Sequence, residues 1–329
     1  MRKVLVTGGA GYIGSHVVKQ LGQAGYEVVI VDNLTTGREK SVLNGRLIKA
    51  DIGDVAAMDK ILSEHSFLAC LHFAGSISVT ESVSNPLKYY ENNVVNSLKL
   101  LNLCKKYGIN KFIFSSTAAV YGNPENGICT EETTISPINP YGHTKVQTEQ
   151  MINDLASSDN NFKFVILRYF NVAGASIDGK IGQAGPVATH LIKIASQVVA
   201  GMRDKIEVFG NDYETRDGTC IRDYIHIEDL ADAHVESLKY LEQGNESVTV
   251  NCGYGEGFSV EEVLKEMRIA TNHPIPSVIS NRRAGDAAIL IAKAQKIKDT
   301  IGWTPKHNNL ALICKTASEW EKKLLKDGY

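Results

Sequence analysis

The chain has 329 residues, of which 43% are hydrophobic, and its formal net charge at pH 7 is −2. A nearly neutral chain has no field of one sign to attract nucleic acid or an anionic membrane, so we expect neither as a partner. No apolar run approaches the roughly 18 residues of a membrane span, and the N-terminus begins directly with a predicted strand, without a signal peptide. Six scattered cysteines without C-x-x-C spacing favour buried thiols over disulfides or a zinc site. We therefore expect a cytoplasmic protein of two domains that holds no metal.

The first predicted strand leads directly into a glycine-rich loop. Lys3–Thr7 is a short apolar run, typical of a buried parallel strand, and Gly8–Gly14 has the sequence GGAGYIG. Gly9, Gly11 and Gly14 satisfy the spacing G-x-G-x-x-G, and an amphipathic helix pattern follows. Glycines at these positions allow a tight turn and let a pyrophosphate approach backbone N–H groups at the helix N-terminus. The segment therefore predicts a dinucleotide site.

A carboxylate follows the second predicted strand, where the adenine ribose of a dinucleotide would lie. The strand Glu27–Val31 ends at Asp32, about 20 residues beyond the glycine loop. A carboxylate there accepts hydrogen bonds from ribose hydroxyls and repels a 2′-phosphate. Asn33 stands where an arginine would bind that phosphate, so the sequence favours NAD over NADP.

Strand and helix patterns then alternate up to about residue 170. The next predicted elements are strands at Arg46–Ala50 and Phe67–Leu71, a long helix at Pro86–Tyr107, and strands at Lys111–Phe114 and Phe164–Leu167. Repeated β-α-β units predict a parallel, doubly wound α/β sheet, which binds its ligand at the carboxyl ends of the strands. We expect one shared cleft, because polar or small residues occupy those ends: Thr7, Asp32, Asp51, Gly75, Ser115–Thr117 and Tyr169.

A tyrosine and a lysine lie four residues apart in the segment Tyr141-Gly-His-Thr-Lys145. In a helix opened by Asn139-Pro140, this spacing places both side chains on one face. The ammonium favours the phenolate form of the tyrosine, which makes the phenol a tunable base. The hydroxyl-rich segment Ser115–Thr117 precedes them in the chain. This order of motifs favours a functional site; a turn cap at Thr117 and a solvated charge at Lys145 are the alternatives.

The C-terminal half has a looser pattern of glycine-rich turns, mixed strands and shorter helices. We place a domain boundary near residue 175, with an NAD-binding domain at 1–175 and a smaller mixed α/β domain for the substrate at 176–329. Arg222–His226 and the helix pattern around Asp229 indicate that the chain returns to the first domain over residues 222–252.

Over essentially its full length, the chain resembles the extended short-chain dehydrogenase/reductase family, and within it the nucleotide-sugar 4-epimerases. The resemblance in the first half is carried by Thr7–Gly14, Asp32–Leu34, His72–Gly75, Tyr89–Asn93, Phe114–Gly122, Tyr141–Lys145 and Arg168–Asn171. Three later segments are more specific to the epimerase branch: Phe209–Tyr213, Asp217–Tyr224 and Arg282–Asp286. The resemblance implies a Rossmann domain that binds NAD as cofactor.

It also implies an isomerase that interconverts UDP-galactose and UDP-glucose through a 4-keto sugar, which turns over in the site. Tyr141 would remove the proton of the sugar 4-hydroxyl while the C4 hydride passes to NAD and later returns to the other face. Thr117 would donate a hydrogen bond to the same oxygen. Lys145 would bind the nicotinamide ribose, and its charge and that of the nicotinamide would both lower the pKa of Tyr141.

The resemblance implies the residues around both ligands. Cofactor contacts are expected from Gly8, Gly11, Tyr12, Ile13, Gly14, Asp32, Asn33, Leu34, Thr35, Thr36, Gly37, Asp51, Ile52, Phe73, Ala74, Gly75, Ile77, Asn92, Ser115, Tyr141, Lys145 and Phe170. Substrate contacts are expected from Thr117, Tyr141, Asn171, His190, Leu191, Val208, Phe209, Arg222, Arg283, Asp286 and Leu290. Arg222 and Arg283 would bind the diphosphate, because a guanidinium matches phosphate oxygens. Asn171 would reach a phosphate, Asp286 a ribose hydroxyl, and Phe209 the uracil, with an ordinary core position as the alternative for Phe209.

Two positions depart from the family pattern. Ile77 stands where many members carry a lysine, which puts that cofactor contact in question. Leu290 stands at the position whose bulk limits the sugar, where a large aromatic favours plain hexoses and a small residue admits N-acetylated ones. A leucine is intermediate, so interconversion of UDP-N-acetylglucosamine and UDP-N-acetylgalactosamine stays open.

Other activities on the same scaffold can be compared with single residues. Ala118-Ala119 follows Thr117 where 4,6-dehydratases need an Asp-Glu pair, which argues strongly against elimination of water. A net NAD-dependent nucleotide-sugar dehydrogenase stays open. A non-catalytic NAD-sensing protein is a further alternative, although the intact set of hydroxyl, phenol and ammonium argues against it. By analogy with the family we also expect a homodimer, formed through helices at Asn93–Lys106 and Gln147–Leu155.

Overall fold

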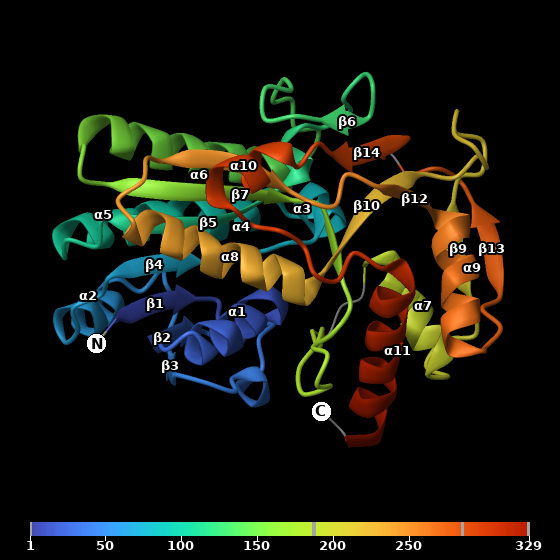
Figure 1. The fold of residues 1–329 in the computed structure, drawn as a ribbon, viewed down its shortest axis with the longest axis horizontal. Coiled ribbons are helices and arrows are strands. Elements are labelled where there is room, and N and C mark those ends of the chain that lie inside the picture. The colour runs from blue at the N-terminus through green and yellow to red at the C-terminus, as the bar shows by residue number, and fades with distance from the viewer. Residues whose placement is uncertain (1, 186–188, 284–285, 328–329) are drawn as a thin grey trace.

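The computed structural model describes residues 2–185, 189–283 and 286–327. A seven-stranded sheet forms the centre of the larger part of the molecule (Figure 1). All of its strand pairs are parallel, as the alternating pattern predicts. The order across the sheet is β11 (Val248–Cys252), β7 (Lys163–Tyr169), β5 (Lys111–Thr117), β4 (Ala69–His72), β1 (Lys3–Thr7), β2 (Glu27–Asp32) and β3 (Arg46–Lys49). The chain thus winds outward from β1 in both directions, which confirms the doubly wound fold.

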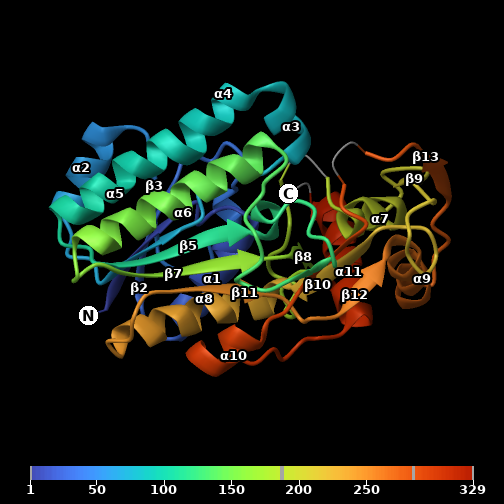
Figure 2. The same cartoon turned by 90° about the horizontal axis from the view of Figure 1, so that it is seen from above.

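Helices cover both faces of this sheet (Figure 2). One face carries α2 (Val55–Ser63), α5 (Asn96–Lys106) and α6 (Pro140–Ser158), and the other carries α1 (Tyr12–Gln23), α8 (Ile227–Glu242) and α10 (Gln295–Ile301). Successive side chains of β1 serve opposite cores: Val4 and Val6 pack with residues of α1 and α8, and Leu5 packs with residues of α2 and α5. A strand buried on both faces needs apolar residues at every position, which explains the unbroken apolar run near the N-terminus.

Helix α6 begins where its sequence predicts. The side chain of Asn139 accepts a hydrogen bond from the backbone N–H of Gly142 (2.9 Å), and Pro140 occupies the first turn, where no N–H is needed. The cap places Tyr141 in the first turn of α6 and Lys145 about one turn later.

One predicted strand has different limits in the structure. The strand expected at Phe67–Leu71 is β4, which begins at Ala69 and ends at His72. Its pairing with β1 starts only at Val4 and Ala69, so the apolar run enters the core before it enters the sheet. Hydrophobicity alone does not mark that point.

The long helix expected at Pro86–Tyr107 is divided into three segments. They are α4 (Pro86–Tyr89), the π-helical segment η2 (Tyr90–Val95) and α5. In η2 the carbonyl oxygen of Asn93 accepts hydrogen bonds from Ser97 Oγ (2.6 Å) and Thr148 Oγ1 (3.0 Å). Side-chain donors therefore compete for the backbone of the helix, and π-helical turns of this kind are often found at functional sites.

The smaller part of the molecule lies beyond the carboxyl ends of the large sheet (Figures 1 and 2). Its main sheet has the order β12 (Gly257–Ser259), β10 (Ile221–His226), β14 (Ile289–Ala292) and β6 (Ile128–Cys129), and β8 (Asn171–Ala173) also pairs with β10. A second sheet pairs β9 (Ile206–Phe209) with β13 (Ser277–Ser280), and three helices pack around one core: α7 (Leu191–Val199), α9 (Val260–Thr271) and α11 (Leu310–Asp327). After β10 the chain returns to the large sheet through α8 and β11. Within the described ranges, no helix combines the length and the apolar character that crossing a membrane requires.

Candidate active site

The glycine loop lies at the carboxyl end of β1, tightly packed against the loop after β4. A side chain on Gly8, whose φ is +72°, would place its Cβ 2.8 Å from the backbone Cα of Ala74. At the far side of the loop, a Cβ on Gly14 would lie 2.8 Å from the Cα of Gly9. The glycines thus leave backbone N–H groups at the start of α1 open to a ligand, which fits the pyrophosphate of a dinucleotide.

Asp32 ends β2 and fixes the loop that follows it. Its two carboxylate oxygens accept hydrogen bonds from the backbone N–H groups of Ala10 (2.9 Å) and Leu34 (2.8 Å). Leu34 has a φ of +61°, a left-handed conformation that non-glycine residues seldom adopt. Asn33 in turn donates to Asp51 Oδ2 (2.8 Å), so the ends of β2 and β3 are joined. The strained conformation of Leu34 is retained because its surroundings fix the loop. The Asp32 carboxylate still has lone pairs that can accept hydrogen bonds from ribose hydroxyls.

The loop after β4 is held by two asparagines of η2. The side chain of Asn93 accepts from the backbone N–H of Ser76 (2.7 Å) and donates to its carbonyl oxygen (3.0 Å). Asn92, one of the expected cofactor residues, donates to Ser76 Oγ (2.9 Å). Ile77, which follows Ser76 in the chain, is 59% exposed, so its apolar side chain is largely outside the core. Asn93 and Ser76 were not among the expected site residues, because the π-helical turn that brings them together has no periodic signal in the sequence.

Thr117, Tyr141 and Lys145 are all buried where β5 meets α6. The Lys145 ammonium donates to the carbonyl oxygen of Ser115 (2.8 Å) and lies 4.7 Å from the centre of the Phe114 ring. It also faces the loop after β4, since a Cβ on Gly75 would lie 4.0 Å from Lys145 Nζ. An ammonium in this place can reach a ribose bound along that loop.

The hydroxyl of Thr117 has two roles in this structure. It accepts a hydrogen bond from the backbone N–H of Ala119 (3.1 Å), as in the turn-cap alternative, and it lowers the pKa of the neighbouring Tyr141 phenol. Beside it, Ser115 Oγ donates to the hydroxyl of Tyr169 (3.1 Å) at the end of β7. Tyr169 was expected only as a strand end; its aromatic ring and hydroxyl both lie among the site residues.

Burial sets the charge states of the site. It raises the pKa of the Tyr141 phenol well above its usual range near 10, and the neighbouring Thr117 hydroxyl lowers it only in part. The lowering of this pKa by Lys145 together with the bound nicotinamide stays a prediction, and desolvation is the opposing effect that the prediction left out. Burial also lowers the pKa of Lys145 to about 8, which the carboxylate of Glu149 opposes. A base near neutral pH therefore needs the charge of the bound nicotinamide as well.

The expected diphosphate and uridine residues form two contacts in the smaller part. The Arg222 guanidinium lies 3.6 Å from Asp286 Oδ1, and the Arg283 guanidinium lies 3.8 Å from the centre of the Phe209 ring. The ring of Phe209 is only partly buried, so its alternative role as an ordinary core residue is not what the structure describes. A guanidinium that stacks on an aromatic ring keeps the N–H groups along its own edge free to donate to phosphate oxygens.

The other expected substrate residues line neighbouring elements. Asn171 opens β8 and is in register with Tyr224 of β10, whereas Leu290 of β14 is in register with Arg222. His190 precedes α7, with its Nδ1 buried and without a hydrogen-bond partner in the described ranges, and Leu191 is the first residue of α7. Val208 is buried in β9 next to Phe209.

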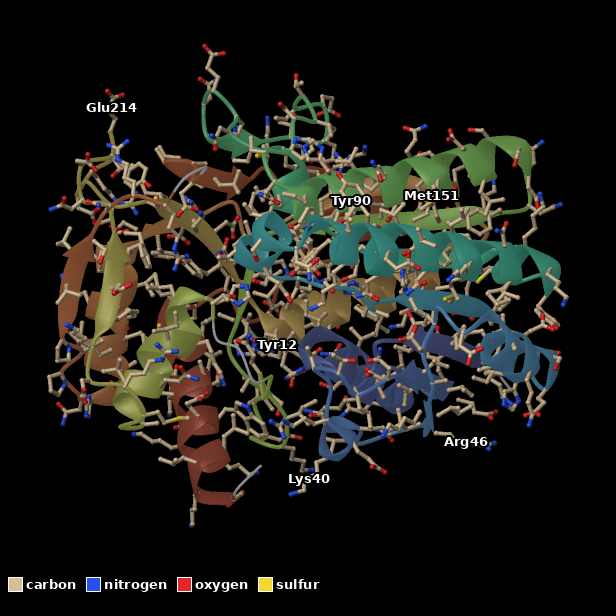
Figure 3. The ribbon with its side chains drawn as sticks, turned by 180° about the vertical axis from the view of Figure 1, so that it is seen from behind. Tyr12, Lys40, Arg46, Tyr90, Met151 and Glu214 are labelled. Atoms are coloured by element: carbon tan, nitrogen blue, oxygen red, sulfur yellow. The ribbon has the colours of Figure 1, made fainter. Side chains whose placement is uncertain are left out.

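The remaining expected cofactor residues lie at the edge where β1 to β4 and β7 end. Tyr12 lies where the larger and smaller parts meet (Figure 3), and its hydroxyl donates to the carbonyl oxygen of Gly174 (2.6 Å). Gly11 and Ile13 lie beside β1, and Thr35, Thr36 and Gly37 lie beyond the end of β2. Ile52 lies beyond β3, Phe73 beyond β4 and Phe170 beyond β7.

The model of the NAD dependent epimerase/dehydratase family matches residues 4–253. The chain belongs to this family. A curated relative in the family, the UDP-glucose 4-epimerase of Azospirillum brasilense, is 50% identical over 98% of this chain and 92% of its own length. The crystal structure of UDP-glucose 4-epimerase from Brucella ovis in complex with NAD has a TM-score of 0.95 at 41% identity, with 98% of this chain and 99% of that chain covered. The UDP-Glc/GlcNAc 4-epimerase of Campylobacter jejuni has a TM-score of 0.87 at 45% identity, with coverage of 98% and 100%.

Proposed function

We propose that this chain is an NAD-dependent UDP-glucose 4-epimerase, an isomerase that interconverts UDP-galactose and UDP-glucose. The observation that carries the proposal is the burial of Thr117, Tyr141 and Lys145 beside the dinucleotide loop, with the Thr117 hydroxyl near enough to the Tyr141 phenol to lower its pKa. The 50% identity to a UDP-glucose 4-epimerase over 98% of this chain supports the choice of substrate.

The residues of the site would perform the reaction as follows. NAD, when bound, accepts a hydride from C4 of the sugar and returns it to the opposite face. Tyr141 Oη takes the proton of the 4-hydroxyl and gives it back after the 4-keto sugar has turned in the pocket. Thr117 donates to the same oxygen, and the Lys145 ammonium stabilises the phenolate. Arg222 and Arg283 hold the diphosphate while the sugar turns, so the substrate stays bound throughout.

The cofactor site would hold NAD tightly, because the hydride returns in every cycle and the cofactor need not leave. We expect the purified protein to contain NAD and to work without added cofactor. Asp32→Ala should weaken NAD binding and reduce discrimination against NADP, since the carboxylate that repels a 2′-phosphate is lost. NAD content and the activities restored by NAD and NADP measure both effects; a variant with unchanged cofactor choice contradicts the assignment of Asp32.

The sugar specificity would extend from plain to N-acetylated hexoses. Leu290 is only partly buried on β14, in register with Arg222, and its side chain is smaller than an aromatic ring. The relative from Campylobacter jejuni, described as a UDP-Glc/GlcNAc 4-epimerase, supports this second activity. UDP-galactose is the main substrate in this proposal, and UDP-N-acetylgalactosamine the weaker one.

The protein would act as a homodimer in the cytoplasm. Segments η2, α5 and α6 lie side by side on the face shown in Figure 3, where Tyr90 and Met151 are labelled. Exposed apolar side chains of η2 and α5, Val95 (37%) and Leu98 (46%), are suited to an interface with a second copy. The buried thiols of all six cysteines support a reducing compartment. Sedimentation of the purified protein distinguishes a dimer from a monomer.

Incubation of the purified protein with UDP-galactose tests the function. We expect UDP-glucose to form without net accumulation of NADH. A net dehydrogenase accumulates NADH in proportion to product, and an NAD-sensing protein forms neither. Parallel incubation with UDP-N-acetylgalactosamine measures the second activity under the same conditions.

A further inference from the structure

A buried ion pair lies directly behind the candidate active site. Glu149 of α6 and Arg168 of β7 are 5% and 8% exposed. Arg168 Nη2 donates to Glu149 Oε2 (2.6 Å), and Arg168 Nε lies 3.1 Å from Oε1 and 3.2 Å from Oε2. The two side chains therefore meet with two guanidinium nitrogens on two carboxylate oxygens, the strongest geometry for this pair.

The pair joins the elements that carry the expected catalytic groups. Ser116, which lies between the Lys145 acceptor Ser115 and Thr117 on β5, donates its hydroxyl to Glu149 Oε1 (2.5 Å). On the other side, Arg168 Nη1 donates to the hydroxyl of Tyr121 (3.1 Å). One carboxylate thus connects α6, β5 and β7, and every hydrogen bond in this connection is buried.

Stability does not account for a buried pair of this kind. Removing two charges from water is costly, and apolar side chains of similar volume are often as stable or more stable in the same place. The pair does have a geometric use: it fixes the rotation of α6 against β5 and β7. It also has an electrostatic use, because Glu149 follows Lys145 by one helical turn on the same face.

Among the groups around Lys145, the Glu149 carboxylate is the negative charge that raises the pKa of its ammonium. Burial lowers the pKa of Lys145 to about 8, and the Glu149 carboxylate raises it. His72 on β4 is neutral, because burial and the charge of Lys145 lower its pKa to about 3. Tyr141 and Tyr169, on neighbouring elements, are neutral phenols. Arg168 is already paired with Glu149. Glu81 and Lys88, on the helices packed against α6, form an ion pair with each other.

We propose that the Glu149–Arg168 pair is a positioning device for this reaction, which holds Thr117, Tyr141 and Lys145 in register and keeps the Lys145 ammonium charged. The proposal rests on the proposed function, because Tyr141 and Lys145 are its reacting groups. Neither Glu149 nor Arg168 touches substrate or cofactor in this scheme.

Two sets of variants separate the geometric from the electrostatic use. Ser116→Ala removes the link to β5 and leaves the ion pair, so kcat for UDP-galactose should fall about tenfold with an unchanged pH profile. Glu149→Met/Arg168→Met removes both charges without stranding one of them. It should lower kcat further, leave KM within about twofold, and move the alkaline limit of activity down by roughly 0.2–0.4 pH unit, the order expected for an ion pair whose carboxylate lies one helical turn away.

A second buried ion pair provides the matched control. Lys193 of α7 and Glu321 of α11 are hydrogen-bonded in the smaller part, with 6% and 2% of their side chains exposed. Lys193→Met/Glu321→Met removes the same two kinds of charge, so any change in thermal stability should be comparable, while the pH profile stays that of the wild type. A kcat and pH profile like the wild type in a folded, NAD-containing Glu149→Met/Arg168→Met protein overturns the proposal, and so does an equal pH shift in the control.

A readout without sugar keeps the inference separate from the proposed function. The Lys145 ammonium is expected to hold the nicotinamide ribose, so NAD should be released on ultrafiltration when this group loses its charge. Release should begin at a pH roughly 0.2–0.4 unit lower in Glu149→Met/Arg168→Met than in the wild type. If the wild type fails to convert UDP-galactose, the proposed function falls, whereas an identical pH of release in both proteins overturns the role of the pair.

Discussion

Replacing Gly14 with alanine tests how closely helix α1 must approach the cofactor loop. The new Cβ would overlap the carbonyl oxygen of Gly8 even more strongly than the Cα of Gly9, which lies 2.8 Å away, whereas ordinary contacts begin at 3.4 Å. Both neighbours are backbone, so α1 has to retreat from the loop by at least about 0.6 Å, the difference between these distances. Overpacking of this kind costs about 1–3 kcal/mol. If about 2 kcal/mol of this overpacking cost is subtracted from the free energy of NAD binding, the Kd for NAD rises roughly 30-fold.

The assay is the NAD content of the purified protein, followed by titration with NAD and measurement of activity. Gly22→Ala is the matched control, because Gly22 lies near the other end of α1 and its new Cβ would lie 2.8 Å from Asn44 Cβ, a comparable overlap away from the cofactor loop. That variant should lose thermal stability and keep its cofactor. Gly14→Ala with the NAD content of the control would refute the reasoning, since the helix terminus would then not need its close approach.

Three further predictions concern the chemistry of the site. Tyr141→Phe keeps the ring and removes the proton acceptor, so turnover should fall by about 10²–10⁴ while NAD stays bound; wild-type turnover in rate assays refutes the role of the phenol. Lys145→Met removes the charge that stabilises the phenolate and holds the nicotinamide ribose, so in the presence of excess NAD activity should fall and its acid limit should move to higher pH; an unchanged acid limit counts against this role. Leu290→Tyr should depress turnover of UDP-N-acetylgalactosamine far more than that of UDP-galactose; equal losses show that Leu290 does not limit the sugar.

The sequence predicts the parts of the fold that depend on short-range patterns. Asp32 was placed at the end of its strand because an apolar run stops there, and the structure ends β2 at that residue. The cap at Asn139-Pro140 gave the start of α6, and with it the helical position of Tyr141 and Lys145. In both cases, the residues that determine the conformation are neighbours in the chain.

Contacts between distant segments were not predictable in the same way. Glu149 and Arg168 are charged residues in an amphipathic helix and at a strand end, and nothing local indicates that they meet inside the protein. The π-helical turn at Asn93 involves the hydroxyl of Thr148 on α6, 55 residues away in the chain, as well as that of nearby Ser97. The high pKa of Tyr141 has the same origin, because desolvation is a property of the assembled core and not of the residues next to the tyrosine.

The return of the chain to the large sheet has a practical consequence for dividing this protein. A fragment that stops near residue 175, the boundary we predict from the sequence, lacks β11 and α8 although both pack on its core. Strand β7 would then become an edge with unpaired N–H and C=O groups, and the apolar side chains beneath α8 would face water. Neither half of the chain is therefore a self-contained module. To exchange the substrate-binding part between relatives, one junction is needed before β8 and one after β10, and further junctions are needed for the substrate-binding segments that follow β11.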